Sequence, residues 1–261
     1  MAYTNRMQEK LARGAVALCM ATRLARTAEI GMIADACGFD ALFVDMEHTA
    51  ITLETAAQIC IAALPIGITP LVRIPGHDFD EATRVMDMGA QGIICPNVST
   101  RDEALAFTDA CRFPPVGNRS VGGIGALQGY RATPLGEVNA QGNAATTLIP
   151  MIETPEGVAN ADAIAAVPGI DILLVGSNDL CTAMGIPGEL KSPKLRAAYE
   201  AVAKACAAHK KILGVGGIRG DVPHLAELIK LGARFVITAS DVQYLMKAAR
   251  DEAAALRKAA S

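Results

Sequence analysis

Eight short apolar runs recur along the chain, and each is followed by a longer stretch with helical spacing of apolar residues. This alternation is typical of parallel β/α units. Runs such as A-L-F-V-D are nearly continuously apolar, as expected where both faces of a parallel sheet are covered. Eight units predict an α/β protein with a closed (β/α)8 barrel of the TIM type, formed by residues 1–261 as a single domain. The predicted strands span residues 15–20, 41–45, 70–74, 92–95, 148–152, 171–175, 212–216 and 234–238.

The predicted helices fill the intervals between these strands. The last of them is long and amphipathic and ends A-A-A-L-R-K-A-A-S, so we expect it to pack on another body, such as a second subunit. Residues 112–143 break the repeat with three prolines and the run V-G-N-R-S-V-G-G-I-G. They predict a long loop, which is either functional or mobile, or else simply an insertion at the surface. The helices span residues 27–37, 53–64, 79–88, 102–111, 156–167, 193–209, 222–231 and 242–258.

The composition and charge of the chain exclude several classes of protein. The chain is 51% hydrophobic and 20% charged with a net charge of −3, which excludes a disordered protein. It has no long Lys/Arg cluster, so we expect no nucleic-acid partner. Prolines and a glycine break the longest uncharged run, residues 55–72, and Glu9, Lys10 and Arg13 lie where a signal peptide would be apolar. These features predict no membrane partner and a cytoplasmic location. The seven cysteines form no C-x-x-C pair, so they indicate neither a disulfide framework nor a thiolate zinc site.

Polar residues directly follow several of the predicted strands. In a (β/α)8 barrel the active site lies at the carboxyl ends of the strands, so such residues are candidates for function. Because these strand ends meet at one rim, we expect the side chains to lie together. They are Asp45, Glu47 and His48 after the second strand, Arg73 and His77 after the third, Glu153 after the fifth and Asp179 after the sixth.

Glu153 and Asp179 follow neighbouring strands and predict a metal site. Two carboxylates placed close together at neutral pH need to share a proton or a cation. Two carboxylates with waters suit Mg²⁺ or Mn²⁺ and leave positions for a substrate to chelate. The alternative is structural: Glu153 would cap the helix that begins at T-P-E-G, and Asp179 would form a turn. The matched positions of the pair favour the metal.

His48 and Arg73 are the candidates for proton transfer and charge stabilisation. Asp45 precedes His48 by three residues, close enough to orient an imidazole that acts as a general base near neutral pH. A histidine after a strand is also a common structural hydrogen-bonding group. Arg73 either pairs with Asp45 or Glu47, or faces a substrate oxygen that becomes negative during reaction, and we favour the second role.

Other polar residues carry weaker signals. His77 is a reserve candidate, whereas His209 and His224 lie on or beside predicted helices and are expected to be solvated. No lysine closes a strand, so the sequence lacks the amine that a Schiff-base mechanism needs, and carbanion stabilisation would fall to the metal. The run G-V-G-G-I-R-G-D after the seventh strand fits either a phosphate-holding loop or a tight turn.

Six segments together resemble one known family, the HpcH/HpaI-type class II aldolases, over about residues 14–247. The segments are V-D-M-E-H-T, P-L-V-R-I-P, D-M-G-A-Q-G-I-I-C-P, R-F-P-P-V-G-N-R-S-V-G-G, M-I-E-T-P-E-G-V-A-N-A-D-A-I-A-A-V-P-G-I-D and V-G-S-N-D-L-C-T-A-M-G. The resemblance implies a metal-dependent barrel enzyme that forms or breaks a carbon–carbon bond beside a pyruvate-like 2-oxo acid, with an aldehyde as the other partner. It also implies a homo-oligomer, often a hexamer.

The resemblance assigns roles to matching positions. It implies Glu153 and Asp179 as ligands of a divalent metal, which is Mg²⁺, Mn²⁺, Co²⁺ or another ion. Arg73 would lie beside the keto or enolate oxygen, and His48 with Asp45 would form the acid/base pair. The backbone N–H groups around three further residues would hold the substrate carboxylate: Gly176, Ser177 and Asn178.

This chain also departs from the family pattern. Many relatives have G-P-x-D-L-S where this chain has G-S-N-D-L-C, many have Gln at the position of Met151, and some have a bulkier residue at Gly216. These changes predict altered donor or acceptor selectivity, such as tolerance of hydroxypyruvate. Three other functions stay open: an oxaloacetate decarboxylase, a hydroxyacyl-CoA lyase and a barrel that only binds a carboxylate.

Overall fold

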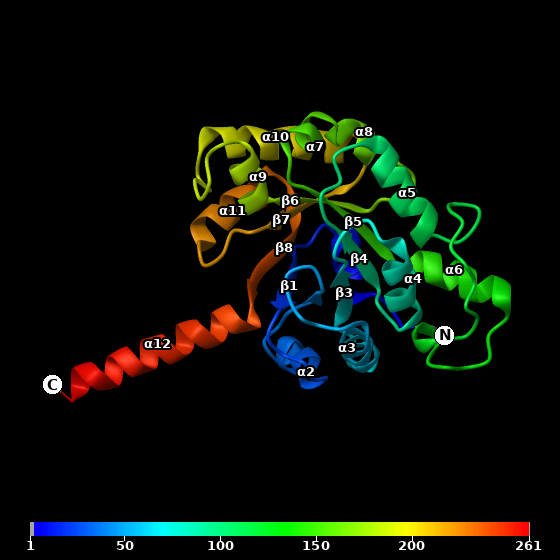
Figure 1. Ribbon diagram of the computed structural model, residues 1–261, viewed down its shortest axis with the longest axis horizontal. Helices are drawn as coiled ribbons and strands as arrows, with labels where there is room; N and C mark the ends of the chain where they lie inside the picture. The colour runs from blue at the N-terminus through cyan, green and yellow to red at the C-terminus, as the bar shows by residue number, and fades with distance from the viewer. Residues whose placement is uncertain (1–2, 261) are drawn as a thin grey trace.

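Eight parallel strands form a closed barrel in sequential order, and β8 pairs with β1 to complete it (Figure 1). The computed structural model describes residues 3–260. The predicted α/β class and (β/α)8 barrel are confirmed. The strands are β1 (Ala17–Thr22), β2 (Ala41–Asp45), β3 (Thr69–Arg73), β4 (Gly92–Cys95), β5 (Thr147–Ile152), β6 (Ile172–Gly176), β7 (Ile212–Gly216) and β8 (Ala233–Ser240).

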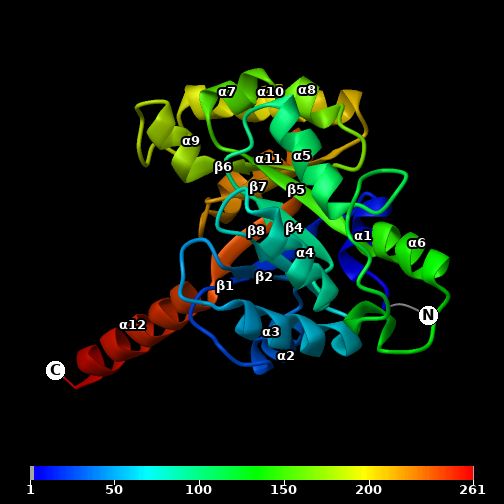
Figure 2. The same cartoon turned by 45° about the vertical axis from the view of Figure 1, so that its right-hand side comes forward.

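Helices surround the barrel, and most of them lie where the repeat predicts them. Helix α12 does not pack around the barrel along its length but extends away from the rest of the molecule in both views (Figures 1 and 2). The helices are α1 (Arg6–Ala12), α2 (Glu29–Ala36), α3 (Leu53–Ile66), α4 (Phe79–Asp87), α5 (Arg101–Cys111), the 3-10 turn η1 (Ala126–Gln128), α6 (Leu135–Ala145), α7 (Pro155–Ala159), α8 (Ala161–Ala165), α9 (Ser177–Ala183), α10 (Pro193–Ala208), α11 (Val222–Leu231) and α12 (Asp241–Ala259).

The strands bury both of their faces. One set of side chains, which includes Phe43 and Leu71, forms an apolar core with residues from other strands inside the barrel. A second set, which includes Val44 and Val72, packs in a larger core together with the surrounding helices. All five residues of β2 are therefore buried, as its continuous apolar run predicts.

Helix α1 lies outside the predicted repeat and covers the amino end of the barrel. Its side chains Met7 and Leu11 belong to the apolar core inside the barrel. Asn5 begins the helix, because its side chain accepts the backbone N–H of Gln8 and donates to the carbonyl of Ala145 at 2.8 Å. This end of the barrel is closed, which leaves the carboxyl ends of the strands for a site.

Residues 112–143 connect the end of α5 to the approach to β5, so they too lie at the amino end of the barrel. Apart from η1, residues 113–134 contain no regular helix or strand, whereas the end of the predicted loop is the first part of α6. Val138 and Ala145, seven residues apart on α6, are buried. The guanidinium of Arg112 fixes the end of α6 by donating to the carbonyl of Asn143 at 2.5 Å. The segment is therefore anchored at α6 but largely exposed over residues 114–137, and it lies at the end of the barrel opposite to the carboxyl ends of the strands.

The single helix predicted over residues 156–167 is wrong, because Asn160 separates α7 from α8. The side chain of Asn160 donates to the backbone carbonyl of Ser99 at 2.8 Å, which ties this break to the loop before α5. No helix among residues 3–260 combines the length and the apolar content needed to cross a bilayer.

Candidate functional site

A cavity of about 230 Å³ opens at the carboxyl ends of the strands. The end opposite to α1 thus holds the candidate site, as the barrel rule predicts. None of the described residues that line this cavity is a lysine. Three of the candidate residues, Glu47, His77 and Glu153, do not line it directly. The predicted residues that do are Asp45, His48, Arg73, Gly176, Ser177, Asn178 and Asp179.

Asp45 and Arg73 form a buried ion pair at the ends of β2 and β3. The strand register places the two residues side by side. Arg73 makes two bonds to the carboxylate, from Nη2 to Oδ2 at 2.8 Å and from Nε to Oδ1 at 3.1 Å. The Asp45 side chain is fully buried. Burial acts to raise the pKa of Asp45, but the hydrogen bond and charge of Arg73 hold this pKa below its usual value.

Two further charges complete this ion-pair cluster. Arg23 Nε lies 3.1 Å from Asp45 Oδ2, and Glu47 Oε2 lies 3.0 Å from Arg73 Nη1. Each carboxylate on the β1–β3 side of the cavity therefore has an arginine partner. Arg73 pairs with Asp45 and Glu47, which is the structural role considered from the sequence, and its side chain also lines the cavity.

His48 lies at the rim, and its side chain is 51% exposed. Its Nε2 lies 3.5 Å from Glu47 Oε2, whereas Asp45 accepts the backbone N–H of His48 at 3.3 Å. Asp45 thus fixes the loop that carries His48, and the carboxylate beside the ring is Glu47. This differs from the predicted pairing, because the Asp45 side chain is already held between two arginines.

Glu153 follows β5 and is almost completely buried, with 4% exposure. Its Oε1 accepts the backbone N–H of Asn97 at 2.7 Å. Burial and the nearby carboxylates of Asp179 and Glu47 raise the pKa of Glu153 to about 7, although Asn97 and Arg73 act in the opposite direction. The β5–β6 side of the cavity therefore holds a carboxyl group whose negative charge is not compensated.

The residues around Glu153 fit a divalent cation. Asp179 is exposed in the first turn of α9 and close enough for its charge to act on Glu153. Gly176 leaves space at this point, since a Cβ there would lie 2.4 Å from Glu153 Oε2. Residues 3–260 contain no cluster of three or more His, Cys, Asp or Glu side chains arranged around a metal. A cation here would thus have two carboxylate ligands, and water and substrate would fill its other positions, as is usual for Mg²⁺.

The structural alternative for Glu153 is wrong. The side chain that caps α7 is Thr154, whose Oγ1 accepts the backbone N–H of Gly157 at 3.0 Å. Glu153 makes no such cap and is directed beside Gly176 instead. Its carboxylate therefore has no role in beginning the helix.

Ser177 begins α9 directly after β6, and its hydroxyl is not available to a ligand. The Ser177 Oγ lies 2.8 Å from the hydroxyl of Tyr199, and both side chains are buried. Asn178 is exposed and donates from Nδ2 to the carbonyl of Gly217 at 3.4 Å. Any contact of Ser177 with a substrate in the cavity would thus use its backbone.

The remaining residues singled out from the sequence fall into two groups. His77 Nε2 lies 2.9 Å from the carbonyl of Pro96, and His77 does not line the cavity, so its role is structural. Met151 and Gly216, where the chain departs from the family pattern, both line the cavity. The Met151 sulfur lies 3.8 Å from Arg73 Nη1. These departures therefore alter the cavity itself.

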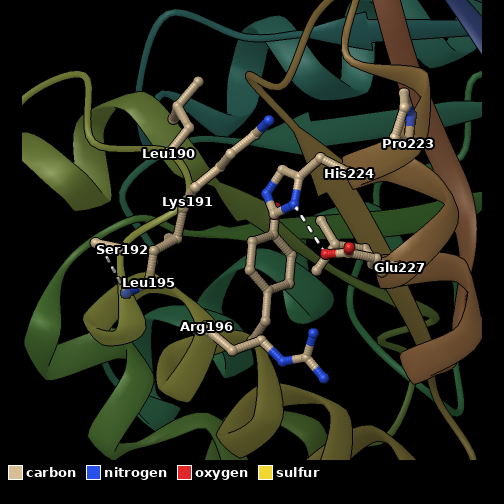
Figure 3. A pocket seen from close by; sticks show the side chains of 10 residues that line it. Leu190, Lys191, Ser192, Leu195, Arg196, Pro223, His224 and Glu227 are labelled. Carbon is tan, nitrogen blue, oxygen red and sulfur yellow. Dashed lines mark hydrogen bonds and ion pairs between the residues drawn. The ribbon is translucent and has the colours of Figure 1, made fainter.

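A second cavity, of about 190 Å³, lies outside the barrel between α10 and α11 (Figure 3). His224 and Glu227 of α11 face each other there, with 3.6 Å between Nδ1 and Oε2. The His224 side chain is only 10% exposed, so the expectation that it is solvated is wrong. Lys191 and Arg196 at this cavity pair with acidic residues of their own surroundings, at 2.6 and 2.7 Å. The charged side chains at this cavity are paired with one another or with their neighbours, so it has no uncompensated charge cluster.

Sequence reasoning did not select Arg23 and Arg219, which line the cavity at the strand ends. Arg23 directly follows β1, which ends at Thr22, two residues beyond the predicted end of the first strand. The correct strand end would have made Arg23 a candidate by the same rule as the other residues. The signal for Arg219 was its place in the Gly-rich run after β7. The structure thus adds two arginines to the predicted set.

Comparison with known proteins gives one family. Residues 24–248 match the family model described as HpcH/HpaI aldolase/citrate lyase. The chain is 40% identical over 262 residues to a 4-hydroxy-4-methyl-2-oxoglutarate aldolase of Hapsidospora irregularis, which covers 98% of this chain and 96% of the relative. It is 35% identical over 226 residues to a 4-hydroxy-2-oxovalerate aldolase of Novosphingobium aromaticivorans, covering 84% of this chain and 83% of the relative.

A solved structure gives the same grouping. The crystal structure of an HpcH/HpaI aldolase from Desulfitobacterium hafniense DCB-2 is similar to this chain with a TM-score of 0.92 and 26% sequence identity. The similarity covers 98% of this chain and 97% of that one. It therefore includes all eight strands and the loops that carry the candidate site.

Proposed function

The chain belongs to the HpcH/HpaI aldolase/citrate lyase family, and on that basis we propose that it is a divalent-metal-dependent aldolase, a carbon–carbon lyase. Its substrates would be 4-hydroxy-2-oxo acids, cleaved to an aldehyde and to pyruvate or a pyruvate-like donor such as hydroxypyruvate. The same enzyme would form these acids in the reverse direction. The aldolase names of the matched relatives support this reaction class.

The observation that carries the proposal is the buried, uncompensated Glu153 beside Asp179. A carboxylate with 4% exposure and carboxylate neighbours is costly in a cavity unless it binds a cation. We propose that Glu153 and Asp179 hold Mg²⁺, Mn²⁺ or a similar ion such as Co²⁺. When bound, such an ion acts as a Lewis acid toward the oxygens of a 2-oxo acid.

The remaining residues would then divide the reaction between them. In cleavage, His48 would accept the proton of the 4-hydroxyl group, and it would return this proton during aldol addition. As the C3–C4 bond breaks, its electron pair moves into the 2-oxo acid, whose keto oxygen becomes negative. Arg73 would stabilise that oxygen, and Asp45 would keep the guanidinium in place through its two bonds. Glu47 would adjust the orientation of the imidazole.

The substrate carboxylate would bind at the start of α9. We propose that the backbone N–H groups around Gly176, Ser177 and Asn178 hold it, as the family resemblance implies. The bond between the Ser177 and Tyr199 hydroxyls supports a backbone contact, since the side chain has a partner already. The space left by Gly216, and the thioether of Met151 beside Arg73, support an altered choice of donor or acceptor.

Metal removal tests the proposal. EDTA-treated protein is expected to lose cleavage of 4-hydroxy-2-oxovalerate, measured as pyruvate release, and to regain it with Mg²⁺, Mn²⁺ or Co²⁺. Cleavage at the same rate with and without EDTA would contradict the metal proposal. Glu153→Gln and Asp179→Asn should weaken metal binding in calorimetry without unfolding the protein. Glu156→Gln, an exposed neighbour, is the matched control, and unchanged affinity in both site variants would remove them as ligands.

We also propose that the protein is a homo-oligomer, a hexamer as the family resemblance implies, in which α12 packs on a second copy. No residue of α12 is buried, and Leu245 and Leu256 on it are 58% and 64% exposed. A largely apolar cavity at its base, lined in part by Ile33 and Phe39, supports an apolar partner. Light scattering should show a multimer, and Leu245→Glu should reduce its mass. An unchanged mass in that variant would contradict the role of α12.

We further propose a cytoplasmic location. All seven cysteines are free, and six of them are buried. Free cysteines are typical of a reducing compartment. The small-molecule partners would be the 2-oxo acid and the aldehyde.

A further inference from the structure

Arg219 lies at the rim of the strand-end cavity, in the Gly-rich loop that follows β7. Gly217 and Gly220 flank the turn with φ angles of +87° and +70°, a conformation that favours glycine. Within residues 3–260, Arg219 makes neither a hydrogen bond nor an ion pair. The loop therefore presents a guanidinium to the cavity without a protein partner for it.

The other two arginines of the cavity differ from Arg219 in this respect. Arg73 is bonded to Asp45 and Glu47, and Arg23 is ion-paired with Asp45. Partial burial, followed by the nearby charges of Arg23 and Arg73, lowers the pKa of Arg219 from its usual value, yet an arginine stays protonated. The positive charge of Arg219 is therefore repelled by Arg23 and Arg73, and the carboxylate that acts in the opposite direction, Asp45, is already ion-paired with these two arginines.

The position of Arg219 favours the acceptor half of a substrate. The proposed donor contacts, Glu153, Asp179 and the start of α9, lie at the ends of β5 and β6. Arg219 comes from the next strand, where Gly216 and Gly217 place no side chains in the cavity. A substituent at the aldol carbon thus has space on this side, and a guanidinium binds a carboxylate through paired N–H groups.

We propose that Arg219 binds a carboxylate carried by the acceptor half, so that the enzyme selects 4-hydroxy-2-oxo acids with a second carboxylate at C4. The carbonyl product of cleavage would then itself be a 2-oxo acid rather than a simple aldehyde. This inference rests on the proposed aldolase function. From the sequence, the Gly-rich run that contains Arg219 fits either a phosphate-holding loop or a tight turn. The inference assigns to it a carboxylate-binding role instead.

Two substrates that differ at one position test it. 4-Hydroxy-4-methyl-2-oxoglutarate and 4-hydroxy-2-oxovalerate differ only in a carboxylate or a hydrogen at C4. A charged hydrogen-bonding pair is worth about 1.5–3 kcal/mol, so Arg219→Gln should lower the ratio of the two kcat/KM values roughly 10- to 100-fold, chiefly through KM for the dicarboxylate. Arg219→Lys should restore part of the ratio. Arg84→Gln, an exposed arginine of α4, controls for the loss of one charge.

A second measurement separates binding from structure. Exchange of the pyruvate methyl protons with deuterated solvent uses the donor half alone, so Arg219→Gln should affect this exchange far less than it affects dicarboxylate cleavage. An equal loss in exchange and in cleavage of both substrates would overturn the assignment. If the wild type cleaves 4-hydroxy-2-oxovalerate and the ratio does not depend on Arg219, the inference fails while the aldolase function stands. If neither substrate is cleaved, both fail.

Discussion

On the β1–β3 side of the cavity Asp45 is buried among arginines, whereas on the β5–β6 side Glu153 is buried among carboxylates. Both residues are almost completely buried: Asp45 is 0% exposed and Glu153 is 4% exposed. Arg73 and Arg23 hold the pKa of Asp45 below its usual value, while burial and the charge of Asp179 raise the pKa of Glu153 to about 7. Burial alone therefore does not decide the charge state; the sign of the neighbouring charge does.

The difference separates a permanent structure from a site that needs a ligand. The β1–β3 cluster satisfies its charges internally, so it can hold Arg73 and the loop of His48 in one geometry before substrate binds. The β5–β6 pair gains its missing positive charge only from outside the chain. Removing a charge should accordingly have opposite effects on stability on the two sides.

The largest effect is expected from Arg73→Met on the compensated side. This change leaves Asp45 buried with Arg23 as its one arginine partner, and breaking a buried pair costs about 3–5 kcal/mol. Urea unfolding of the EDTA-treated variant should show a loss of this order. Arg73→Lys should lose less, although one ammonium cannot make both bonds to the carboxylate. A loss below about 1 kcal/mol in Arg73→Met would mean that Asp45 is not held as the structure indicates.

The elements that the sequence predicts are those with a local pattern. Strands β2, β4 and β7 have the predicted bounds, because each is an apolar run that ends at a polar residue, a proline or a glycine. Helix α1 has no such signal, since its stability comes from Met7 and Leu11 entering the barrel far from their sequence neighbours. The break at Asn160 likewise depends on a bond to Ser99, which no local pattern contains.

The candidate site shows the same limit. The strand-end rule brings Asp45, Arg73 and Asp179 to one cavity, because the carboxyl ends of parallel strands must meet there. The choice of partners depends on contacts between strands, so the sequence did not predict that His48 lies beside Glu47. The spacing along the chain places His48 near Asp45, but the Asp45 carboxylate is ion-paired with Arg23 and Arg73, which follow other strands.

The second effect, of opposite sign, is expected from Glu153→Gln and depends on pH. The folded-state pKa of Glu153 is raised from 4.5 to about 7, so its stabilising contribution is present below pH 4.5 and is lost as the pH rises through 7. At about 1.4 kcal/mol per pKa unit, metal-free Glu153→Gln should be more stable than the wild type by up to about 3.5 kcal/mol at pH 8. Unfolding curves between pH 5 and pH 8 measure this difference.

Two outcomes bear on that prediction. Mg²⁺ or Mn²⁺ added at pH 8 should stabilise the wild type and leave the glutamine variant unchanged. A stability difference that does not vary with pH would mean that Glu153 is not the carboxyl group that titrates, and the contrast between the two sides would be lost.

A smaller effect is expected from Gly176→Ala, which tests the space beside Glu153. The added Cβ would lie 2.4 Å from Glu153 Oε2, so the side chain must shift, at a cost of about 1–3 kcal/mol. Gly216→Ala is the matched control, because its Cβ would meet its nearest atoms at 3.4 Å, an ordinary contact. The first variant should lose stability and metal affinity in unfolding and calorimetric titrations. Equal behaviour of the two variants would contradict a close fit around Glu153.

The smallest effect on stability is expected from His48→Gln, although its effect on turnover should be large. The His48 ring is half exposed and lies beside Glu47 without a buried partner, so unfolding should change by no more than about 0.5 kcal/mol. Loss of a general base should lower cleavage roughly 10²- to 10⁴-fold. His77→Gln is the control, because its bond to the Pro96 carbonyl makes it structural: it should cost about 1 kcal/mol and retain cleavage. If His48→Gln instead lost stability and kept turnover, His48 would belong to the ion-pair cluster and not to proton transfer.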